Sequence, residues 1–385
     1  MDKTLTIGFD AKRIMRNGTG LGNYCRTLVN DLALYDSNLQ LRLYAPDMGK
    51  KELREQLETR NNMTIVMPHG KVPLGKVKGS IWRMGGIVKD LKLDGINIYH
   101  GLTGELPIGL KRNNIASIVT IHDLIFLRHP EYYNWIDTKL YSWKFRVACE
   151  EATRIVAISE CTKRDIMEFG GVDENKIDVI YQSCGTRFKT LVSGEQKSCV
   201  RSKYSLPERY ILFVGTIEER KNALLAVKAL PLLPSDVHLV LVGRRTAYAD
   251  RIDDYGKRNS LSDRIHFLSG VPTSDLYAIY QQAECFVYPS RYEGFGIPIV
   301  EAIQSGLPVV ACTGSCLEEA GGPHSLYVSP DDWEGMATAI RHMLCSNPDR
   351  QQIIARSKEY VKRFENNDIA SRMLELYHSV ASISR

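Results

Sequence analysis

Short apolar runs rich in β-branched residues alternate with helical patterns along almost the whole chain, and this alternation limits the folds available to it. Continuous apolar runs are typical of strands buried on both faces, as in a parallel sheet covered by helices. The sequence therefore predicts an α/β fold. The predicted strands are residues 5–10, 41–45, 64–67, 96–100, 117–121, 155–159 and 177–181 in the first half, and 211–214, 239–242, 265–268, 286–288, 309–311 and 326–328 in the second.

The length of the chain predicts two domains. At 385 residues it exceeds the size at which one hydrophobic core keeps growing. The two series of strands are separated by a stretch where strand signals lapse and Ser, Gly and Lys accumulate. We therefore predict an N-terminal domain over residues 1–185, a linker over 186–207, a C-terminal domain over 208–365 and a final helix over 366–385.

Composition and charge argue against several classes of protein. The chain is 44% hydrophobic and 25% charged, as is usual for a soluble globular protein. Its formal net charge of +5 comes without a basic tail or an aromatic–basic repeat, so it does not indicate nucleic-acid binding. No apolar run approaches the ~20 residues that span a bilayer, and the first residues do not show the pattern of a secretory leader.

The nine cysteines indicate a reducing compartment. Their number is odd, several lie in apolar strand-like runs and no C-x-x-C pair occurs, so we expect free thiols rather than disulfides. Cys312 and Cys316 are the closest pair, but they lack His or Cys partners at zinc spacing. We therefore expect a cytoplasmic protein without a structural metal site.

The run of residues 285–301 carries the most functional information. A strand-like segment leads into a glycine-containing turn and then into an apolar helix pattern, so Gly294 and Gly296 fall where a helix begins. Backbone N–H groups at such a turn bind anions such as phosphate. Glu293 and Glu301 place a carboxylate at each end, and carboxylates accept hydrogen bonds from hydroxyls. Sugar hydroxyls next to a diphosphate describe a nucleotide sugar.

Polar residues and glycines also follow other predicted strands. A glycine-rich loop at residues 18–22 follows the first strand and opens a helix pattern, which allows close approach of the backbone to a ligand. His122 ends the strand at 117–121, where ligands of parallel sheets bind, and His100 is a weaker candidate of the same kind. Arg220 and Lys221 suit a diphosphate leaving group, Arg as a planar fork and Lys as a point charge.

Taken together, these motifs resemble the retaining family 4 glycosyltransferases over nearly the whole chain. That resemblance implies the GT-B fold, in which two Rossmann-like domains have parallel sheets that face each other across a central cleft. It also implies that the N-terminal domain binds the acceptor, that the C-terminal domain binds the nucleotide sugar, and that the last helix crosses back to the N-terminal domain. The motifs are GTGLG at 18–22, TIHD at 120–123, FVGTIEERKN at 213–222, E-x7-E at 293–301 and GLPVV at 306–310.

The resemblance implies roles for the glycine loop and for the residues that follow the strands. Gly20 and Gly22 would approach the donor diphosphate most closely, and His122 would contact the donor sugar as a transition-state dipole or proton partner. Lys221 would carry leaving-group charge. Thr216 stands where many family members have an Arg, which leaves open whether Arg220 substitutes for it.

For the C-terminal domain, the resemblance implies that Glu293 contacts the sugar or its phosphate side and that Glu301 contacts the ribose. Val271 lies where family members hold the nucleobase with backbone atoms. His122, Glu293 and Lys221 are the predicted catalytic residues, and Glu293→Ala is expected to lose turnover with the fold intact. The backbone amides between the two glutamates, predicted to bind the donor, belong to Gly294, Phe295, Gly296 and Ile297.

No D-x-D motif occurs in the chain. Enzymes that hold a diphosphate through a divalent metal typically need such carboxylates, so we expect a reaction without metal or other cofactor. The resemblance implies a same-face displacement, in which the departing phosphate takes the acceptor proton and the anomeric configuration is retained.

The stretch 71–92 has two interpretations, which the sequence leaves open. As an amphipathic helix it would rest on an anionic membrane, where a polyprenyl-linked acceptor would wait. As an ordinary domain helix it would have a solvated basic face. Its basic residues are Lys71, Lys76, Lys78, Arg83, Lys89 and Lys92, against Asp90, and its apolar residues are Ile81, Trp82, Met84, Ile87, Val88 and Leu91.

The sequence as a whole predicts a glycosyltransferase that moves a hexose, best guessed as mannose from GDP-mannose, to a glycan or polyprenyl-linked glycan. Its predicted place is the cytoplasm, with a peripheral position at the inner membrane face left open. The alternatives are a UDP-sugar-dependent glycosyltransferase, a nucleotide-sugar epimerase and a non-catalytic protein that binds sugar nucleotides.

Overall fold

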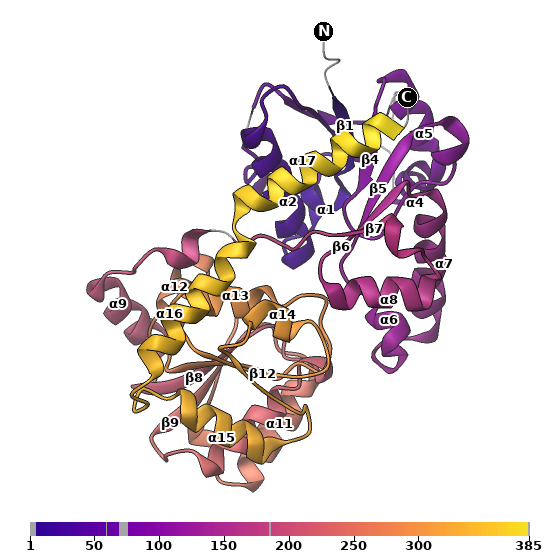
Figure 1. Ribbon diagram of the computed structural model, residues 1–385. Helices are drawn as coiled ribbons and strands as arrows, with labels where there is room; N and C mark the ends of the chain where they lie inside the picture. Colours follow the sequence, from indigo (N-terminus) through magenta and orange to yellow (C-terminus); the bar gives the residue numbers. More distant parts are fainter. Residues whose placement is uncertain (1–4, 59, 69–75, 185, 384–385) are drawn as a thin grey trace. The chain divides into compact units, whose positions relative to one another are not determined.

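The computed structural model describes residues 5–58, 60–68, 76–184 and 186–383. The chain divides into two compact units (Figure 1). Unit 1 consists of Met1–Ser183 and Asn366–Arg385, and unit 2 consists of Cys184–Glu365.

Each unit is built on one parallel sheet. The sheet of unit 1 has seven strands in the order β3-β2-β1-β4-β5-β6-β7, and that of unit 2 has six in the order β10-β9-β8-β11-β12-β13. Every strand predicted from the sequence overlaps one of these strands, so the α/β prediction is confirmed. The strands are β1 Thr6–Asp10, β2 Gln40–Tyr44, β3 Met63–Val66, β4 Ile98–Gly101, β5 Ala116–Ile121, β6 Arg154–Ala157, β7 Ile177–Val179, β8 Arg209–Val214, β9 Val237–Val242, β10 Ile265–Leu268, β11 Cys285–Tyr288, β12 Val309–Cys312 and β13 Leu326–Val328.

Helices connect the strands in both units. In unit 1 they are α1 Lys12–Arg16, α2 Gly20–Tyr35, α3 Lys51–Arg54, α4 Lys76–Ile81, the π-helix η1 Trp82–Gly86, α5 Ile87–Leu93, η2 Lys111–Asn113, α6 Ile125–Arg128, η3 Pro130–Tyr132, α7 Trp135–Glu151, α8 Glu160–Gly170, η4 Glu174–Lys176 and α17 Asn366–Ile383. In unit 2 they are η5 Thr186–Lys189, α9 Gly194–Tyr204, η6 Glu219–Lys221, α10 Ala223–Ala229, η7 Leu230–Leu232, α11 Ala247–Arg258, η8 Ser262–Arg264, α12 Thr273–Tyr280, α13 Ile297–Gln304, α14 Leu317–Gly321, α15 Trp333–Met343, α16 Arg350–Val361 and η9 Lys362–Phe364.

The sheet of unit 1 has a buried hydrophobic core on each face. Ile7 and Phe9 of β1 belong to the core that contains the apolar sides of α2 and α17. Gly8 lies between them and faces the other core. A Cβ atom added at Gly8 would lie 3.1 Å from the Tyr44 ring in that core. That second core contains the buried residues of α5, α7 and α8. The alternation along β1 follows from the two-residue period of a strand.

Helix α17 returns to unit 1, although it follows unit 2 in the sequence. It packs against α2 and β4, and Figure 1 shows it in yellow beside α2. The Tyr377 hydroxyl lies 2.7 Å from Nδ1 of His100 on β4, and Arg372 donates to the carbonyl oxygen of Val179 at 2.7 Å. The helix therefore closes one face of the first sheet.

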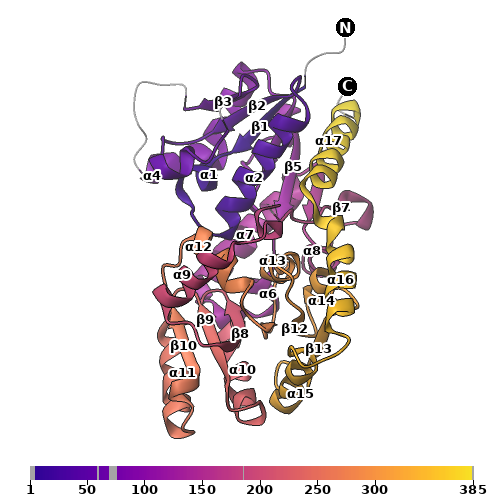
Figure 2. The same ribbon diagram turned by 90° about the vertical axis from the view of Figure 1, so that its left-hand side faces the viewer.

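The structure differs from the sequence prediction at the linker. Residues 186–207 do not form an open connection, because they fold as η5 and α9 within unit 2, and α9 packs beside α12 (Figure 2). Arg201 donates to Gln282 at 3.1 Å and the Tyr204 hydroxyl donates to Asp275 at 2.7 Å. Val200 is the one buried residue of α9, so the helix lacks the apolar periodicity that would have marked it in the sequence.

The stretch 71–92 folds as α4, η1 and α5 in its described part, whereas Lys71 and the side chain of Lys76 lie outside the described residues. Its apolar face packs within unit 1: Trp82, Ile87, Val88 and Leu91 are buried, and the Trp82 indole donates to Asp90 at 2.7 Å. The core of unit 1 therefore takes up four of the six apolar side chains, whereas Ile81 and Met84 are exposed. Contact of the stretch with a membrane stays a prediction. Among the described residues, no helix combines the length and apolar character needed to cross a bilayer.

Candidate active site

The E-x7-E run forms a tight loop between β11 and α13 in unit 2. Gly296 has φ +112°, a conformation that strongly favours glycine, and a Cβ atom there would lie 3.1 Å from the Leu317 side chain. Helix α13 begins at Ile297, and a proline in its first turn suits the fixed backbone angle of a helix start. The loop therefore directs the positive end of α13 toward residues 293–296.

Glu293 is buried between two cations. Its Oε2 lies 3.0 Å from Nη1 of Arg220, and its Oε1 accepts a hydrogen bond from Nζ of Lys221. Lys221 also donates to the Tyr288 hydroxyl at 2.7 Å, and Arg220 donates to the carbonyl oxygen of Tyr292 at 2.7 Å. The structure thus brings together Glu293, Arg220 and Lys221, which the sequence presents as separate motifs. We call these three residues the charge triad.

The protonation states of the charge triad follow from burial and charge. Burial alone would raise the pKa of Glu293, but the charges of Lys221 and Arg220 outweigh it and lower the pKa to about 2. Burial would lower the pKa of Lys221, but Glu293 outweighs it and holds the pKa above its ordinary value. All three side chains are therefore charged at neutral pH. Arg220 also pairs with Glu218 at 2.9 Å, so the charge triad and this neighbour together carry no excess positive charge.

Two residues that sequence reasoning missed support this loop. The Cys316 thiol lies 3.1 Å from the carbonyl oxygen of Glu293 and 3.0 Å from that of Phe295, so it holds the turn from the side of α14. Nothing in the sequence marks this lone cysteine for the role. Tyr288 ends β11 and orients Lys221, and its place at the carboxyl end of a predicted strand was a usable signal.

Glu301 lies half-buried in α13 and does not belong to the charge triad. Burial raises its pKa to about 7, and the hydrogen bond from the Tyr280 hydroxyl to Oε2, at 3.1 Å, only partly opposes this. The carboxyl group therefore changes its charge near neutral pH. Val271 precedes α12, the helix that carries Tyr280, and Thr216 follows β8; both are partly exposed.

In unit 1, His122 follows β5 and is buried with both ring nitrogens engaged. Nε2 donates to the carbonyl oxygen of Leu102 at 2.9 Å, and Nδ1 accepts from the Gln182 amide at 2.7 Å. The edge of the Tyr24 ring also packs on the imidazole. Burial lowers the pKa of His122 to about 4, so the ring is neutral. The imidazole is therefore a fixed, neutral group, and its contact with a donor sugar stays a prediction.

His100 has a structural environment. It is fully buried on β4, where Nδ1 meets the Tyr377 hydroxyl at 2.7 Å and Nε2 meets the Thr120 hydroxyl at 2.9 Å. Burial lowers its pKa to about 3. This weaker candidate therefore ties α17 to β5.

The two glycines of the N-terminal loop differ in their surroundings. A Cβ atom on Gly22 would lie 1.8 Å from the carbonyl oxygen of Asn17, so the path of the loop requires glycine there. A Cβ atom on Gly20 would meet no atom within 4 Å. The fold thus accounts for Gly22, whereas Gly20 is exposed and faces open space at the start of α2.

Among the described residues, no group of three or more His, Cys, Asp or Glu side chains has an arrangement that could hold a metal ion.

Two family models match the chain. Residues 18–184 match the model described as Glycosyltransferase Family 4, and residues 200–360 match the model described as Glycosyl transferases group 1. The chain belongs to the family 4 glycosyltransferases. The family suggested by the sequence motifs is therefore confirmed, and the protein is a glycosyltransferase.

Curated relatives of this glycosyltransferase include enzymes of surface-polysaccharide assembly. An O-antigen chain mannosyltransferase B of Escherichia coli is 29% identical over 374 residues, which cover 93% of this chain and 96% of the relative. An O-antigen chain mannosyltransferase of Salmonella typhimurium, RfbU, is 29% identical over 265 residues, which cover 68% of this chain and 69% of that protein.

Solved structures show the same fold. Anabaena HepE in complex with UDP and glucose superposes with a TM-score of 0.74 at 17% identity, over 98% of this chain and 100% of HepE. A sucrose-phosphate synthase from Thermosynechococcus elongatus gives a TM-score of 0.77 at 19% identity, over 98% of this chain and 100% of the synthase. The glycosyltransferase therefore has the GT-B fold, with one parallel-sheet unit in each half.

The charge triad predicts a coupled loss of stability. Glu293→Gln removes the carboxylate beside the buried Lys221 and leaves Arg220 with Glu218 alone, so we expect the free energy of unfolding to fall by about 3 kcal/mol, together with loss of turnover. This expectation differs from the one drawn from the sequence, in which Glu293→Ala loses turnover with the fold intact. Urea denaturation measures the change. The double variant Glu293→Gln with Lys221→Met should lose less stability than the sum of the two single variants, and additive losses would contradict the coupling.

The raised pKa of Glu301 predicts that binding of a nucleotide sugar varies across neutral pH. The carboxylate accepts hydroxyl hydrogen bonds better than the neutral acid, so Kd should rise as pH falls below about 7, by up to about tenfold per pH unit. Calorimetric titration with a nucleotide sugar measures this, because its diphosphate does not titrate in this range. In Glu301→Gln the dependence should vanish.

A ligand-free measurement checks the same group. Because its folded-state pKa is raised, the stability that the neutral acid contributes is present below about pH 4.5 and lost as pH rises through about 7. The stability of the wild type relative to Glu301→Gln should fall over that window. A constant difference would show that the pKa of Glu301 is not raised.

The two loop glycines predict opposite results for the same substitution. Gly22→Ala forces a Cβ atom onto a backbone carbonyl, so we expect the free energy of unfolding to fall by at least about 2 kcal/mol. Gly20→Ala adds the same atom to open space and should keep wild-type stability. Equal melting temperatures for the two variants would contradict the difference in environment.

Proposed function

We propose that this enzyme is a retaining hexosyltransferase that moves mannose from GDP-mannose to a growing surface glycan or lipid-linked glycan. The observation that carries the proposal is the charge triad beside the glycine turn at α13. It offers the Lys221 ammonium group, which follows β8, and the helix-start amides, which follow β11, to a diphosphate. The mannose donor and glycan acceptor are supported by the printed names of the relatives, which are O-antigen mannosyltransferases.

In this proposal, unit 2 holds the donor. Lys221 has three donor hydrogens, of which two meet Glu293 and Tyr288, and the third reaches a phosphate oxygen. Glu301 accepts from the ribose hydroxyls, and the backbone near Val271 borders the nucleobase. The remaining proposed donor contacts are Thr216, Arg220 and the backbone of Gly294, Phe295, Gly296 and Ile297.

Unit 1 holds the acceptor, and Gly20, Gly22 and His122 contribute from its strand ends. The bond between the anomeric carbon and the diphosphate oxygen breaks, and the acceptor hydroxyl oxygen bonds to the same carbon on the same face. The leaving diphosphate takes the acceptor proton. This route needs no separate base, which agrees with a neutral, doubly hydrogen-bonded His122.

A UDP-sugar donor is the second candidate, because the structural neighbour HepE has been solved with UDP-glucose. Since that neighbour shares 18% identity, it informs the fold rather than the base preference. We also propose a cytoplasmic enzyme that reaches its acceptor at the inner membrane face.

A thermal-shift screen tests the donor assignment. Purified enzyme is scanned with guanosine, uridine, adenosine and cytidine diphosphates and their sugar conjugates, with and without a chelator. We expect GDP-mannose to raise the melting temperature with chelator present, because a ligand that binds only the folded state stabilises it. The double variant Glu293→Gln with Lys221→Met serves as control and should show no shift.

The other outcomes of the screen separate the alternatives. Stabilisation by UDP-sugars alone would replace the donor, and loss of the shift on chelation would contradict metal independence. Conversion of the donor sugar to its epimer without acceptor would indicate an epimerase. No stabilisation by any nucleotide would overturn the proposal. The anomeric configuration of the product, read by NMR, decides whether it is retained.

A further inference from the structure

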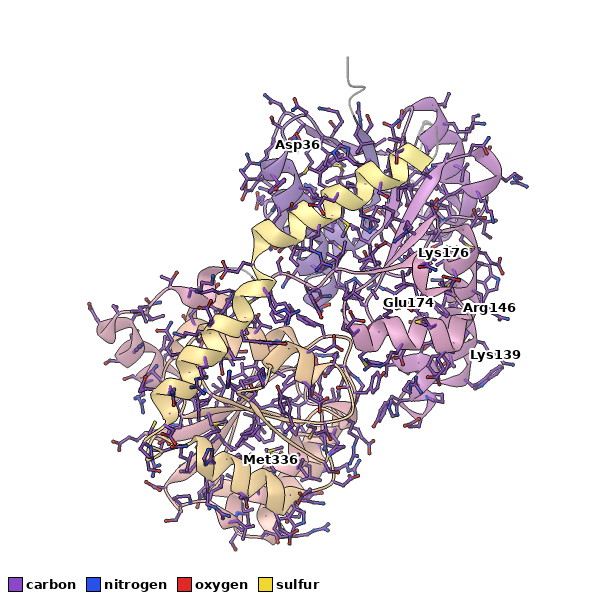
Figure 3. All side chains as sticks on the ribbon, in the orientation of Figure 1. Asp36, Lys139, Arg146, Glu174, Lys176 and Met336 are labelled. Atoms are coloured by element: carbon purple, nitrogen blue, oxygen red, sulfur yellow. The ribbon has the colours of Figure 1, made fainter. Side chains whose placement is uncertain are left out.

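Four hydrogen-bonding side chains form a continuous row through unit 1, from α17 to α2. The Tyr377 hydroxyl lies 2.7 Å from Nδ1 of His100, and Nε2 of His100 lies 2.9 Å from the Thr120 hydroxyl. The Thr120 hydroxyl lies 3.3 Å from the Tyr24 hydroxyl, which is the longest link. Helix α17, which carries Tyr377, lies across the side chains of unit 1 (Figure 3). We call these four residues the polar network.

Burial differs along the polar network. Tyr377, His100 and Thr120 are fully buried, so bulk water cannot take up a hydrogen bond that they leave unmade. Tyr24 on α2 is only partly buried. Among the described residues, none of the four side chains has a hydrogen-bond partner outside the network. Each proton of the network is therefore used within it or at its Tyr24 end.

The protons of the polar network have one arrangement that leaves no buried donor unpaired. Burial lowers the pKa of His100 to about 3, so its ring is neutral, and one ring nitrogen donates while the other accepts. If Nδ1 donated to Tyr377, the proton of the Tyr377 hydroxyl would be buried without an acceptor, which is unfavourable. The Tyr377 hydroxyl therefore donates to Nδ1, and Nε2 carries the imidazole proton.

In this arrangement the Tyr24 proton has no partner among the described residues. Nε2 of His100 donates to the Thr120 oxygen, so the Thr120 hydroxyl gives its own proton to the Tyr24 oxygen. The Tyr24 hydroxyl accepts this bond and keeps its own O–H group available. Because Tyr24 is the partly exposed member of the network, a bound ligand can accept from it.

Tyr24 lies among the predicted site residues of unit 1. The edge of its ring packs on His122, with the ring centres 4.6 Å apart. Gly20 precedes Tyr24 by four positions and so lies on the same face of α2, where it is exposed and faces open space. The sequence predicts that Gly20 and His122 approach a nucleotide sugar. A ligand that approaches both of these residues would also approach Tyr24.

We propose that the Tyr24 hydroxyl donates a hydrogen bond to an oxygen atom of the bound nucleotide sugar. The bond from Thr120 occupies the acceptor side of this hydroxyl and so directs its proton to the ligand. Both a phosphate oxygen and a sugar hydroxyl oxygen can accept such a bond. In its choice of ligand the inference rests on the proposed function, whereas the direction of the polar network does not.

Calorimetric titration of Tyr24→Phe with GDP-mannose and with GDP tests the contact. The variant keeps an aromatic ring beside His122 and removes only the hydroxyl group. We expect Kd for GDP-mannose to rise about tenfold, because the ligand loses one hydrogen bond. An unchanged Kd for GDP would assign the contact to the sugar, and an equal rise would assign it to the diphosphate. If Tyr24→Phe binds both ligands as tightly as the wild type does, the proposal is wrong.

A matched control separates this contact from a loss of stability. Tyr210→Phe also removes a hydroxyl donor, since Tyr210 of unit 2 is fully buried and donates to the carbonyl oxygen of Ile279 at 2.6 Å. Urea denaturation should show a lower stability than the wild type for both variants, whereas only Tyr24→Phe should change Kd. A similar rise in Kd for Tyr210→Phe would attribute the effect to weakened packing and overturn the proposal.

The direction of the polar network is tested without any ligand. Nitrogen-15 NMR of the histidine rings distinguishes the two neutral tautomers, and we expect the His100 proton on Nε2. The His100 signals are assigned by their shift in Tyr377→Phe, which removes the donor to Nδ1. A proton on Nδ1 would reverse the network, engage the Tyr24 proton with Thr120 and contradict the proposal.

The two measurements separate failure of the contact from failure of the proposed function. If the wild type binds neither GDP-mannose nor GDP, the donor assignment and the ligand contact fail together, while the tautomer of His100 still decides the direction of the network. If the wild type binds GDP-mannose and Tyr24→Phe binds it equally well, the contact alone fails. Circular dichroism confirms that each variant is folded.

Discussion

All paired strands in both sheets are parallel, and this constraint determines where functional residues can gather. The carboxyl ends of parallel strands lie along one edge of a sheet, and the loops that leave them carry ligands. In unit 2 this edge unites η6 after β8 with the loop after β11, so Lys221 meets Glu293 although 72 positions separate them. In unit 1 it places His122 after β5 beside the Leu102 carbonyl after β4. The sheet geometry builds each site from distant segments.

The charge triad carries a free-energy penalty, because its three charged side chains are buried. Removing charged groups from water carries a large penalty, and it is offset only when each ion has close partners. Glu293 has Arg220 and Lys221, Lys221 also has Tyr288, and Arg220 also has a backbone carbonyl. Apolar residues would stabilise the same space with less penalty. The retained charges instead give unit 2 a preorganised polar cluster at the carboxyl ends of its strands.

Around His100 and His122, unit 1 uses neutral polar contacts instead. Burial keeps both His100 and His122 uncharged, and their ring nitrogens are satisfied by hydroxyl, amide and carbonyl groups. Tyr377 extends this network from α17, a helix that reaches unit 1 only after the chain has passed through unit 2. The packing around the His122 side of the sheet therefore depends on the last helix of the sequence.

The amino-acid sequence by itself determined the strand positions and singled out Glu293, Arg220 and Lys221, which the structure brings together. Strands buried on both faces are continuous apolar runs, and the glycine turn of the E-x7-E run needs a residue with positive φ, so both leave local signals. Helix α9 left no such signal, because polar contacts to α12 hold it rather than an apolar stripe. Its sequence therefore looked like a linker.

Only the tertiary structure decided which of these residues meet and how they are charged. It paired Glu293 with Arg220 and Lys221, assigned Cys316 to the loop, and separated the structural Gly22 from the open position at Gly20. It also held Glu293 ionised while it raised the pKa of Glu301 to about 7. The two side chains are chemically identical, so the difference arises from burial and neighbouring charge, which exist only in the folded chain.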